Sequence, residues 1–236
     1  MNKYYAMETA EKETDIMIFG DITSWPWMES DVSSYNLSKQ IAGLDTDAIN
    51  IHLNSYGGEV SEGLAIYNAL KQHKAKVRTY CDGFACSIAS VIFMAGDERI
   101  MSNASMLMVH NPWTYTEGNA QELRKTAEDL DKMSQASVNA YMESVSITED
   151  EVKQLLDDET WLTPAEALEY GFATAVTGKD PQAKYSQSVR KGIMQKLLAK
   201  QQEPDPAPQA DLEPEPIPEE KTLMKLFKGV ARKEGK

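Results

Sequence analysis

The chain is organised around the stretch Gly83-Phe84-Ala85-Cys86-Ser87-Ile88-Ala89-Ser90-Val91-Ile92-Phe93-Met94-Ala95-Gly96, where small residues surround two serines and lead into an apolar run. This pattern predicts the start of a helix that is buried on nearly every side. The first turn of a helix has N–H groups without intrahelical partners and a positive dipole end, so it can hold an oxyanion that forms beside a hydroxyl. Ser87 is therefore a candidate nucleophile; a small residue that lets the helix pack closely is the alternative.

The overall composition excludes several classes of protein. The chain has 236 residues, of which 42% are hydrophobic, so it can bury a substantial core. Its net charge of -13 argues against general nucleic-acid binding, which usually needs a basic surface. Cys81 and Cys86 form neither a metal-ligand nor a disulfide pattern, which fits a reducing cytoplasm and predicts no metal site and no cofactor. No apolar run approaches the roughly 20 residues that a membrane helix needs, so we expect a soluble, cytoplasmic protein.

Upstream of the central stretch, short strands alternate with amphipathic helices. Residues 1–14 are expected to form a flexible arm, and residues 15–22 contain the first strand. A strand over 48–54 leads into the turn Asn54-Ser55-Tyr56-Gly57-Gly58, after which a helix begins near Val60. Paired glycines allow positive φ and the close approach of another chain, so this turn can direct backbone N–H groups at an anion. An ordinary turn is the alternative interpretation.

Downstream, three short strands are predicted over 77–81, 99–101 and 106–110. His110 closes the last of them, directly before Asn111-Pro112, where the chain turns away. A histidine at the end of an apolar strand can project into a cleft, although it can also simply cap the strand. His110 is therefore a candidate site residue.

The next segment is predicted to be helical. Residues 119–145 have apolar positions at helical spacing over a long span, typical of a helix that packs against another subunit or the body of the fold. Thr148 and Thr163 have the surroundings of N-caps for two further short helices. Between these helices, Asp158 and Glu159 precede an aromatic and apolar pair.

The character of the chain changes at about residue 178. Residues 201–220 contain six prolines and seven acidic residues without lysine or arginine, so they cannot bury enough apolar surface to fold and are expected to form a linker. Residues 221–236 are basic, with apolar residues at helical spacing, and we expect them to form an amphipathic end that docks on a partner. The expected domains are therefore an arm (1–14), a folded domain (15–178) and a polar tail (179–236).

Several motifs, in order, resemble those of the ClpP serine peptidase family. The resemblance spans roughly residues 15–177, and several ordered motifs are more specific than any single one. The matching segments are Asn54-Ser55-Tyr56-Gly57-Gly58, the Gly83 to Gly96 stretch, Met108-Val109-His110-Asn111-Pro112, and Trp161-Leu162-Thr163-Pro164-Ala165-Glu166-Ala167-Leu168-Glu169-Tyr170-Gly171-Phe172.

The resemblance implies acyl transfer through a covalent intermediate. Ser87 would attack a peptide carbonyl, and His110 would take its proton and later pass it to the leaving amine. The backbone N–H groups of Gly57 and Ile88 would hold the oxyanion.

The third member of the triad is less clearly marked. Aligning Trp161-Leu162-Thr163 with the family places Glu159 where the peptidases usually have aspartate. Asp158 lies one position away, and neighbouring strand residues point to opposite faces, so only one of the two can point at His110. Glu159 is the prediction, and Asp158 is the alternative acid.

The resemblance also implies an architecture. The family fold is a spiral of strand-strand-helix units with a long helix that makes ring contacts, and residues 119–145 resemble that helix. We therefore expect a ring homo-oligomer, with stacked rings as a further possibility, that encloses a chamber. In the housekeeping enzymes an ATP-driven AAA+ unfoldase delivers the protein substrates.

The tail has no counterpart in a typical housekeeping ClpP. It resembles the extensions of ClpP-like head maturation (prohead) proteases of tailed bacteriophages. This favours processing of capsid and scaffold proteins within the procapsid, in the host cytoplasm. A housekeeping Clp subunit is the alternative function.

Two rivals from other classes stay open. A crotonase would share the fold and stabilise a thioester enolate, but it would leave the order of Ser87 and His110 unexplained. An inactive scaffold or assembly protein on the same fold would result if the acid pointed the wrong way.

Overall fold

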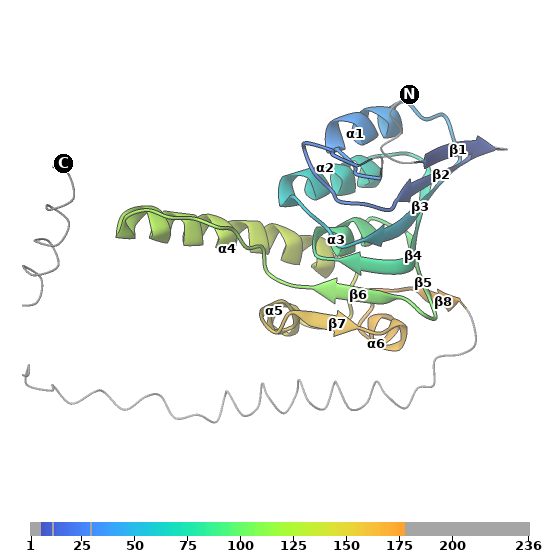
Figure 1. Ribbon diagram of the computed structural model, residues 1–236. Coiled ribbons are helices and arrows are strands. Elements are labelled where there is room, and N and C mark those ends of the chain that lie inside the picture. The colour runs from blue at the N-terminus through green and yellow to red at the C-terminus, as the bar shows by residue number, and fades with distance from the viewer. Residues whose placement is uncertain (1–5, 11, 29, 178–236) are drawn as a thin grey trace, which may run out of the picture. The chain divides into compact units, whose positions relative to one another are not determined.

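The structure, a computed structural model, describes residues 6–10, 12–28 and 30–177, and the expected tail (179–236) lies outside them. The described part is an α/β fold with one mixed sheet, which confirms the predicted class (Figure 1). The strands are β1 (Ala6–Ala10), β2 (Glu13–Ile18), β3 (Ala48–Ser55), β4 (Lys76–Cys86), β5 (Glu98–Ser102), β6 (Met106–Val109), β7 (Thr160–Leu162) and β8 (Ala175–Thr177). The helices are α1 (Ser34–Ala42), α2 (Val60–Lys71), α3 (Ile88–Phe93), α4 (Ala120–Met142), α5 (Glu149–Asp157) and α6 (Pro164–Glu169).

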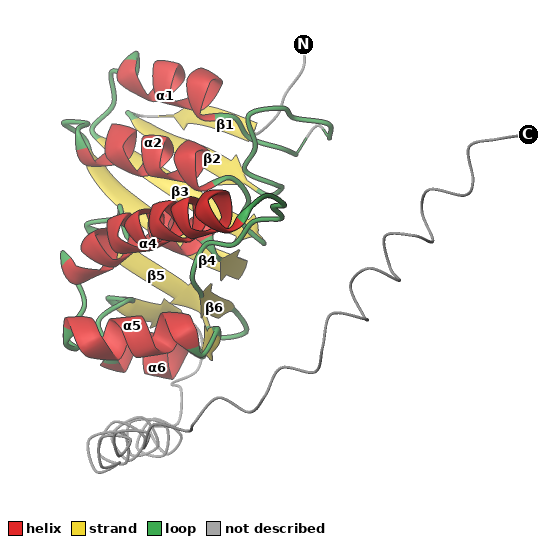
Figure 2. Ribbon diagram, turned by 90° about the vertical axis from the view of Figure 1, so that its left-hand side faces the viewer, coloured by secondary structure: helices red, strands yellow, loops and turns green. Residues whose placement is uncertain are grey.

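The sheet is mostly parallel. Its main order is β1-β2-β3-β4-β5-β8, with an antiparallel pair at β1–β2 and parallel pairs across the rest of this path. The helices lie in front of the strands when the molecule is viewed as in Figure 2. Parallel strands joined by helical crossovers bury their apolar side chains beneath those helices. The core lies there, and Ile16, Ile49, Ile51, Leu53 and Phe93 are fully buried in it.

Strand β4 carries the central stretch of the sequence, and it changes partners along its length. Residues 78–81 pair with β5, whereas residues 84–86 pair with β6. The sequence predicted that the whole stretch 83–96, including its first small residues, is the start of a buried helix. The structure differs from this prediction in residues 83–86. Residues 83–86 are strand because their backbone groups complete the ladder with β6, and α3 starts only after Ser87. All six residues of α3 are buried, as the apolar run predicted.

The N-terminal residues also differ from the expectation. Residues 6–10 and 13–14, assigned to a flexible arm, belong to the antiparallel pair of β1 and β2. Alternate side chains of β2, those of Thr14, Ile16 and Ile18, are buried, so this strand has one face toward the core. The sequence did not predict β1, because the residues of this strand lack strong strand propensity.

The helices of the C-terminal half begin at side-chain caps. Asn119, Thr148 and Thr163 each accept a hydrogen bond from a backbone N–H of the first turn, and a glutamate three positions later bonds back to the cap. These three capping boxes satisfy N–H groups that the first turn leaves unpaired. They confirm the predicted starts of all three helices.

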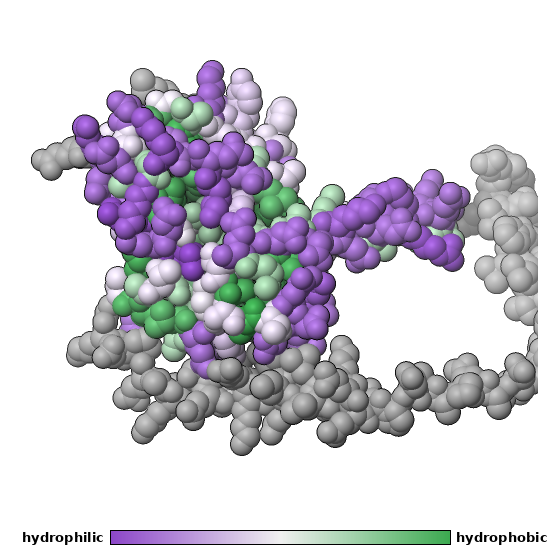
Figure 3. Space-filling view, turned by 180° about the vertical axis from the view of Figure 1, so that it is seen from behind, coloured by the Kyte–Doolittle hydropathy of each residue, from purple (hydrophilic) through white to green (hydrophobic). Residues whose placement is uncertain are grey.

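Helix α4 projects from the body of the fold (Figure 1). Its buried residues are Ser137, Val138, Ala140 and Tyr141, which all lie near its C-terminal end. The projecting part is mostly hydrophilic, with a few apolar side chains (Figure 3). Leu123 and Met133, at 42% and 47% exposure, belong to the apolar stripe that the sequence predicted. None of the described helices is both long and apolar enough to cross a membrane.

Candidate active site

Ser87 lies at the junction of β4 and α3 in a backbone conformation that non-glycine residues rarely adopt. Its φ is 54° and its ψ is -129°. Three hydrogen bonds hold it there: its N–H donates to the Met108 carbonyl (2.9 Å), and its carbonyl accepts from the N–H (2.9 Å) and the hydroxyl (2.5 Å) of Ser90. The Ser90 hydroxyl also bonds to the Tyr141 hydroxyl (2.7 Å). Such strain persists only where the surroundings impose it, and it is concentrated at functional sites.

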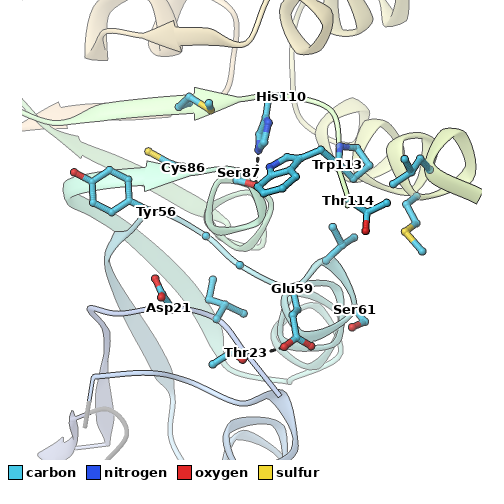
Figure 4. Close-up of a pocket in the computed structure, with 18 of the residues that line it drawn as sticks. Asp21, Thr23, Tyr56, Glu59, Ser61, Cys86, Ser87, His110, Trp113 and Thr114 are labelled. Atoms are coloured by element: carbon cyan, nitrogen blue, oxygen red, sulfur yellow. Dashed lines mark hydrogen bonds between the residues drawn. The ribbon is translucent and has the colours of Figure 1, made fainter. Parts of the chain in front are cut away.

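His110 follows β6 directly and faces Ser87. Its Nε2 lies 2.7 Å from the Ser87 Oγ (Figure 4). Burial lowers the pKa of His110, and the charge of Glu159 opposes this, so that the net pKa is below its usual value. A neutral imidazole at hydrogen-bond distance from a hydroxyl is the arrangement that a general base requires.

The end of β6 is fastened by Asn111. Its side-chain amide donates to Asp157 Oδ1 (2.8 Å), and its amide oxygen accepts from the Ser134 hydroxyl. These bonds tie the residue after His110 to α5 and α4. The sequence placed Asn111 in a motif but gave no signal for this role, because both partners come from distant helices.

Glu159 is placed near His110 by strand pairing. β7 pairs antiparallel with β6, and Val109 lies opposite Thr160. His110 follows Val109 and Glu159 precedes Thr160, so these two residues come next to each other just beyond the paired strands. Glu159 is exposed, and it makes no hydrogen bond to His110 within the described part of the chain. Its charge nevertheless acts on the imidazole. Asp158, the alternative acid, caps the C-terminal end of α5.

Two backbone segments meet beside Ser87. A Cβ built on Gly57 would lie 2.8 Å from the Ser87 Cβ and 3.2 Å from the Ile88 nitrogen, so the glycine turn packs directly on the start of α3. The Gly57 N–H already donates to the Ser55 hydroxyl (3.0 Å). Among the described residues, the N–H groups of Gly58 and Ile88 have no hydrogen-bond partner. Gly57, the predicted oxyanion residue, is the glycine of this turn that packs on Ser87, whereas Gly58 packs on Ile22.

Ser87, His110, Gly57 and Gly58 line one cleft of about 1010 Å³. Tyr56, Trp113 and Trp161 are exposed aromatic residues along it (Figure 4 labels the first two). Sequence reasoning missed Trp113 as a site residue because it lies in a loop without any periodic pattern. The cleft is large enough for several residues of an extended peptide.

Cys86 also lines the cleft, but it is a poor nucleophile. Burial raises the pKa of its thiol to about 11, so the thiol is protonated at neutral pH. The thiolate is the reactive form of cysteine. The nucleophile that the geometry offers is thus a hydroxyl. Within the described residues, no group of three or more His, Cys, Asp or Glu side chains could hold a metal ion.

Comparison with known proteins gives a consistent result. A family model described as Clp protease matches residues 2–180. An ATP-dependent Clp protease proteolytic subunit from Deinococcus radiodurans is 33% identical over 130 residues, which cover 54% of this chain and 64% of that protein. Proteins of the same name from Bacteroides fragilis and Chlorella vulgaris are 32% and 34% identical over 152 and 128 residues, covering 62% and 53% of this chain and 73% and 64% of their own length. The match thus spans just under two thirds of the length of the first of these relatives.

Proposed function

Because the chain belongs to the Clp protease family, we propose that it is a serine endopeptidase with Ser87 as nucleophile and His110 as general base. The observation that carries this proposal is the 2.7 Å contact between the Ser87 Oγ and the His110 Nε2. The imposed backbone conformation of Ser87 supports it, because a small residue present only for packing would not need that strain.

The proposed reaction has two halves. Ser87 Oγ attacks the peptide carbonyl while His110 takes its proton, and the resulting tetrahedral intermediate collapses as His110 gives that proton to the leaving amine. Water then attacks the acyl-enzyme while His110 takes its proton. His110 returns that proton to the Ser87 Oγ as the carboxylic acid product leaves. The N–H of Ile88, at the start of α3, and an N–H of the glycine turn stabilise the oxyanion. The packing of Gly57 on Ser87 and Ile88 supports Gly57 as the residue of the turn that supplies this N–H.

Glu159 is proposed as the acid that stabilises the imidazolium. The support is electrostatic: the charge of Glu159 opposes the lowering of the His110 pKa by burial. In this role Glu159 makes the proton transfer from Ser87 more favourable, while Asp157 and Asn111 hold the neighbouring backbone in place.

The substitution Glu159→Gln should move the acid limb of the pH profile to lower pH. His110 must be neutral to act as a base, so activity is lost as the pH falls through its pKa, which already lies below the usual 6.5. Removing the carboxylate lowers that pKa further and weakens imidazolium stabilisation, so kcat/KM at neutral pH should fall about tenfold or more. The measurement is the pH dependence of kcat/KM on a fluorogenic peptide.

Asp158→Asn is the matched control for this substitution. It removes the adjacent carboxylate and should leave the acid limb in place. A displaced limb in Asp158→Asn together with an unchanged one in Glu159→Gln would reverse the assignment of the acid.

The wider role is proposed from the relatives. Their names describe the proteolytic subunit of an ATP-dependent protease, which supports a subunit that degrades proteins delivered by an ATP-driven unfoldase. The projecting α4, with exposed Leu123 and Met133, supports packing between subunits in a ring. The head maturation role and its capsid and scaffold substrates rest on the tail, which lies outside the described residues, and the relatives named above give them no support.

Labelling with a serine-reactive fluorophosphonate tests the proposed function. Mass mapping of the labelled peptides should place the modification on Ser87 in the wild-type protein, and the label should be absent from Ser87→Ala and strongly reduced in His110→Ala. An assembled, folded protein without label at Ser87 would overturn the proposal.

A further inference from the structure

The cleft has an acidic side that the peptide-bond chemistry does not use. Asp21 and Glu59 line it together with Ser87 and His110, and both are exposed. Figure 4 shows Asp21, Thr23 and Glu59 across the cleft from His110. None of the described residues that line the cleft is a lysine or an arginine. This side of the cleft is therefore negatively charged.

Glu59 is held as a fixed, ionised carboxylate. Its Oε1 accepts hydrogen bonds from the Thr23 hydroxyl (2.9 Å), the Ser24 hydroxyl (2.9 Å) and the Ser24 N–H (3.1 Å). Desolvation raises the pKa of Glu59, but the bonds from Ser24 and Thr23 outweigh it and hold the pKa below its usual value. All three donors are neutral, and within the described residues no lysine, arginine or histidine forms an ion pair with Glu59. Within the described part of the chain, Oε2 has no hydrogen-bond partner.

Asp21 is fixed relative to Ser87 through the backbone. The Ile22 N–H donates to the Gly57 carbonyl (2.9 Å), and the Glu59 N–H donates to the Ile22 carbonyl (2.8 Å). These two bonds join the loop that carries Asp21 to the glycine turn, which itself packs on Ser87. The backbone of Asp21 and the carboxylate of Glu59 are thus both held in place along the cleft.

Asp129, a third carboxylate of the cleft, is different. Its Oδ1 forms ion pairs with Lys125 and with Lys132 (3.5 Å), both on α4. Its charge is therefore compensated locally. This difference makes Asp129 a matched control for the other two carboxylates.

We propose that Asp21 and Glu59 form a cation-selecting subsite, which favours peptide substrates that carry lysine or arginine beside apolar residues. The proposal rests on the peptidase function proposed above. An uncompensated carboxylate attracts an ammonium or guanidinium group, and its fixed position lowers the ordering cost of the contact. The same cleft is lined by the aromatic rings of Tyr56, Trp113 and Trp161. These rings can contact apolar side chains and form cation–π contacts with lysine or arginine.

The test measures binding in the Ser87→Ala protein, so it does not depend on turnover. The probe is a fluorescently labelled peptide with the sequence of residues 221–230, Lys-Thr-Leu-Met-Lys-Leu-Phe-Lys-Gly-Val, which alternates lysines with apolar residues. Two matched peptides carry glutamine or glutamate in place of the three lysines. Fluorescence anisotropy should give a Kd for the lysine peptide about tenfold or more below that of the glutamine peptide, and the glutamate peptide should bind most weakly.

Two variants in the same background and a change of salt concentration locate the effect. Asp21→Asn with Glu59→Gln should bring the ratio of the two Kd values close to one, and glutamine can still accept the hydrogen bonds of Thr23 and Ser24. Asp129→Asn should keep the wild-type ratio. Raising the salt concentration to about 0.5 M should reduce the preference, because exposed charges are screened.

The outcomes separate the two proposals. Equal Kd values for the lysine and glutamine peptides, or a ratio that survives the double substitution, would overturn the subsite. Such a result together with fluorophosphonate labelling of Ser87 in the wild-type protein would leave the peptidase function standing. Selective binding without labelling of Ser87 would overturn the function and leave the subsite.

Discussion

Replacement of Ser87 by alanine will lower kcat for peptide hydrolysis by about 10⁴- to 10⁶-fold, the range expected when the nucleophile of a serine protease is removed. The residue makes the only covalent bond to the acyl group in the proposed mechanism, and His110 then has no hydroxyl to activate. The measurement is hydrolysis of a fluorogenic peptide at enzyme concentrations high enough to follow the residual rate.

The comparison variant is Ser90→Ala, which changes the second serine of the same segment. It removes one hydrogen bond to the Ser87 carbonyl and one to Tyr141, but it keeps the nucleophile. We expect a loss of no more than about tenfold, with Ser87 still labelled by the fluorophosphonate. Losses of similar size in the two variants would mean that Ser87 acts through packing and would contradict its role as nucleophile.

The second large effect is expected at Gly57. Its φ is 103°, and a Cβ there would lie 2.7 Å from the Cys86 carbonyl oxygen and 2.8 Å from the Ser87 Cβ. In Gly57→Ala, either the turn or Ser87 must therefore move. A displacement of about 1 Å at a reacting group costs about 10²-fold in rate, so kcat/KM should fall by about 10²- to 10³-fold.

Gly43→Ala controls for the general effect of adding a methyl group to a glycine. Gly43 has a φ of -91°, and a Cβ there would meet its nearest atom at 3.5 Å, an ordinary contact. This variant should keep the wild-type rate and thermal stability. A Gly57→Ala protein with the wild-type rate of fluorophosphonate labelling would show that the turn does not position Ser87.

The sequence predicted the elements with the strongest local signals. The periodic apolar positions predicted α4, and the caps Thr148 and Thr163 predicted the starts of α5 and α6, because these signals are local. The end of β4 was misassigned to a helix because its small residues pair with β6, and strand pairing depends on segments distant in the sequence.

For the site, the ordered motifs predicted that Ser87 and His110 act together, and the structure places their side chains in hydrogen-bond contact. The acidic side of the cleft could not be predicted in the same way. Asp21 and Glu59 lie far apart in the sequence, and they line the same cleft because the Ile22 backbone bridges to Gly57 and Glu59. No spacing rule encodes such a bridge.

Helix α4 is anchored in the fold by buried residues near its C-terminal end, and its N-terminal part projects from the body (Figure 1). It has 23 residues, so it is about 35 Å long at 1.5 Å per residue. Near the C-terminal end of α4, the Tyr141 hydroxyl forms a hydrogen bond with the Ser90 hydroxyl, which in turn donates to the carbonyl of Ser87. Two hydrogen bonds therefore connect α4 to the backbone of the proposed nucleophile.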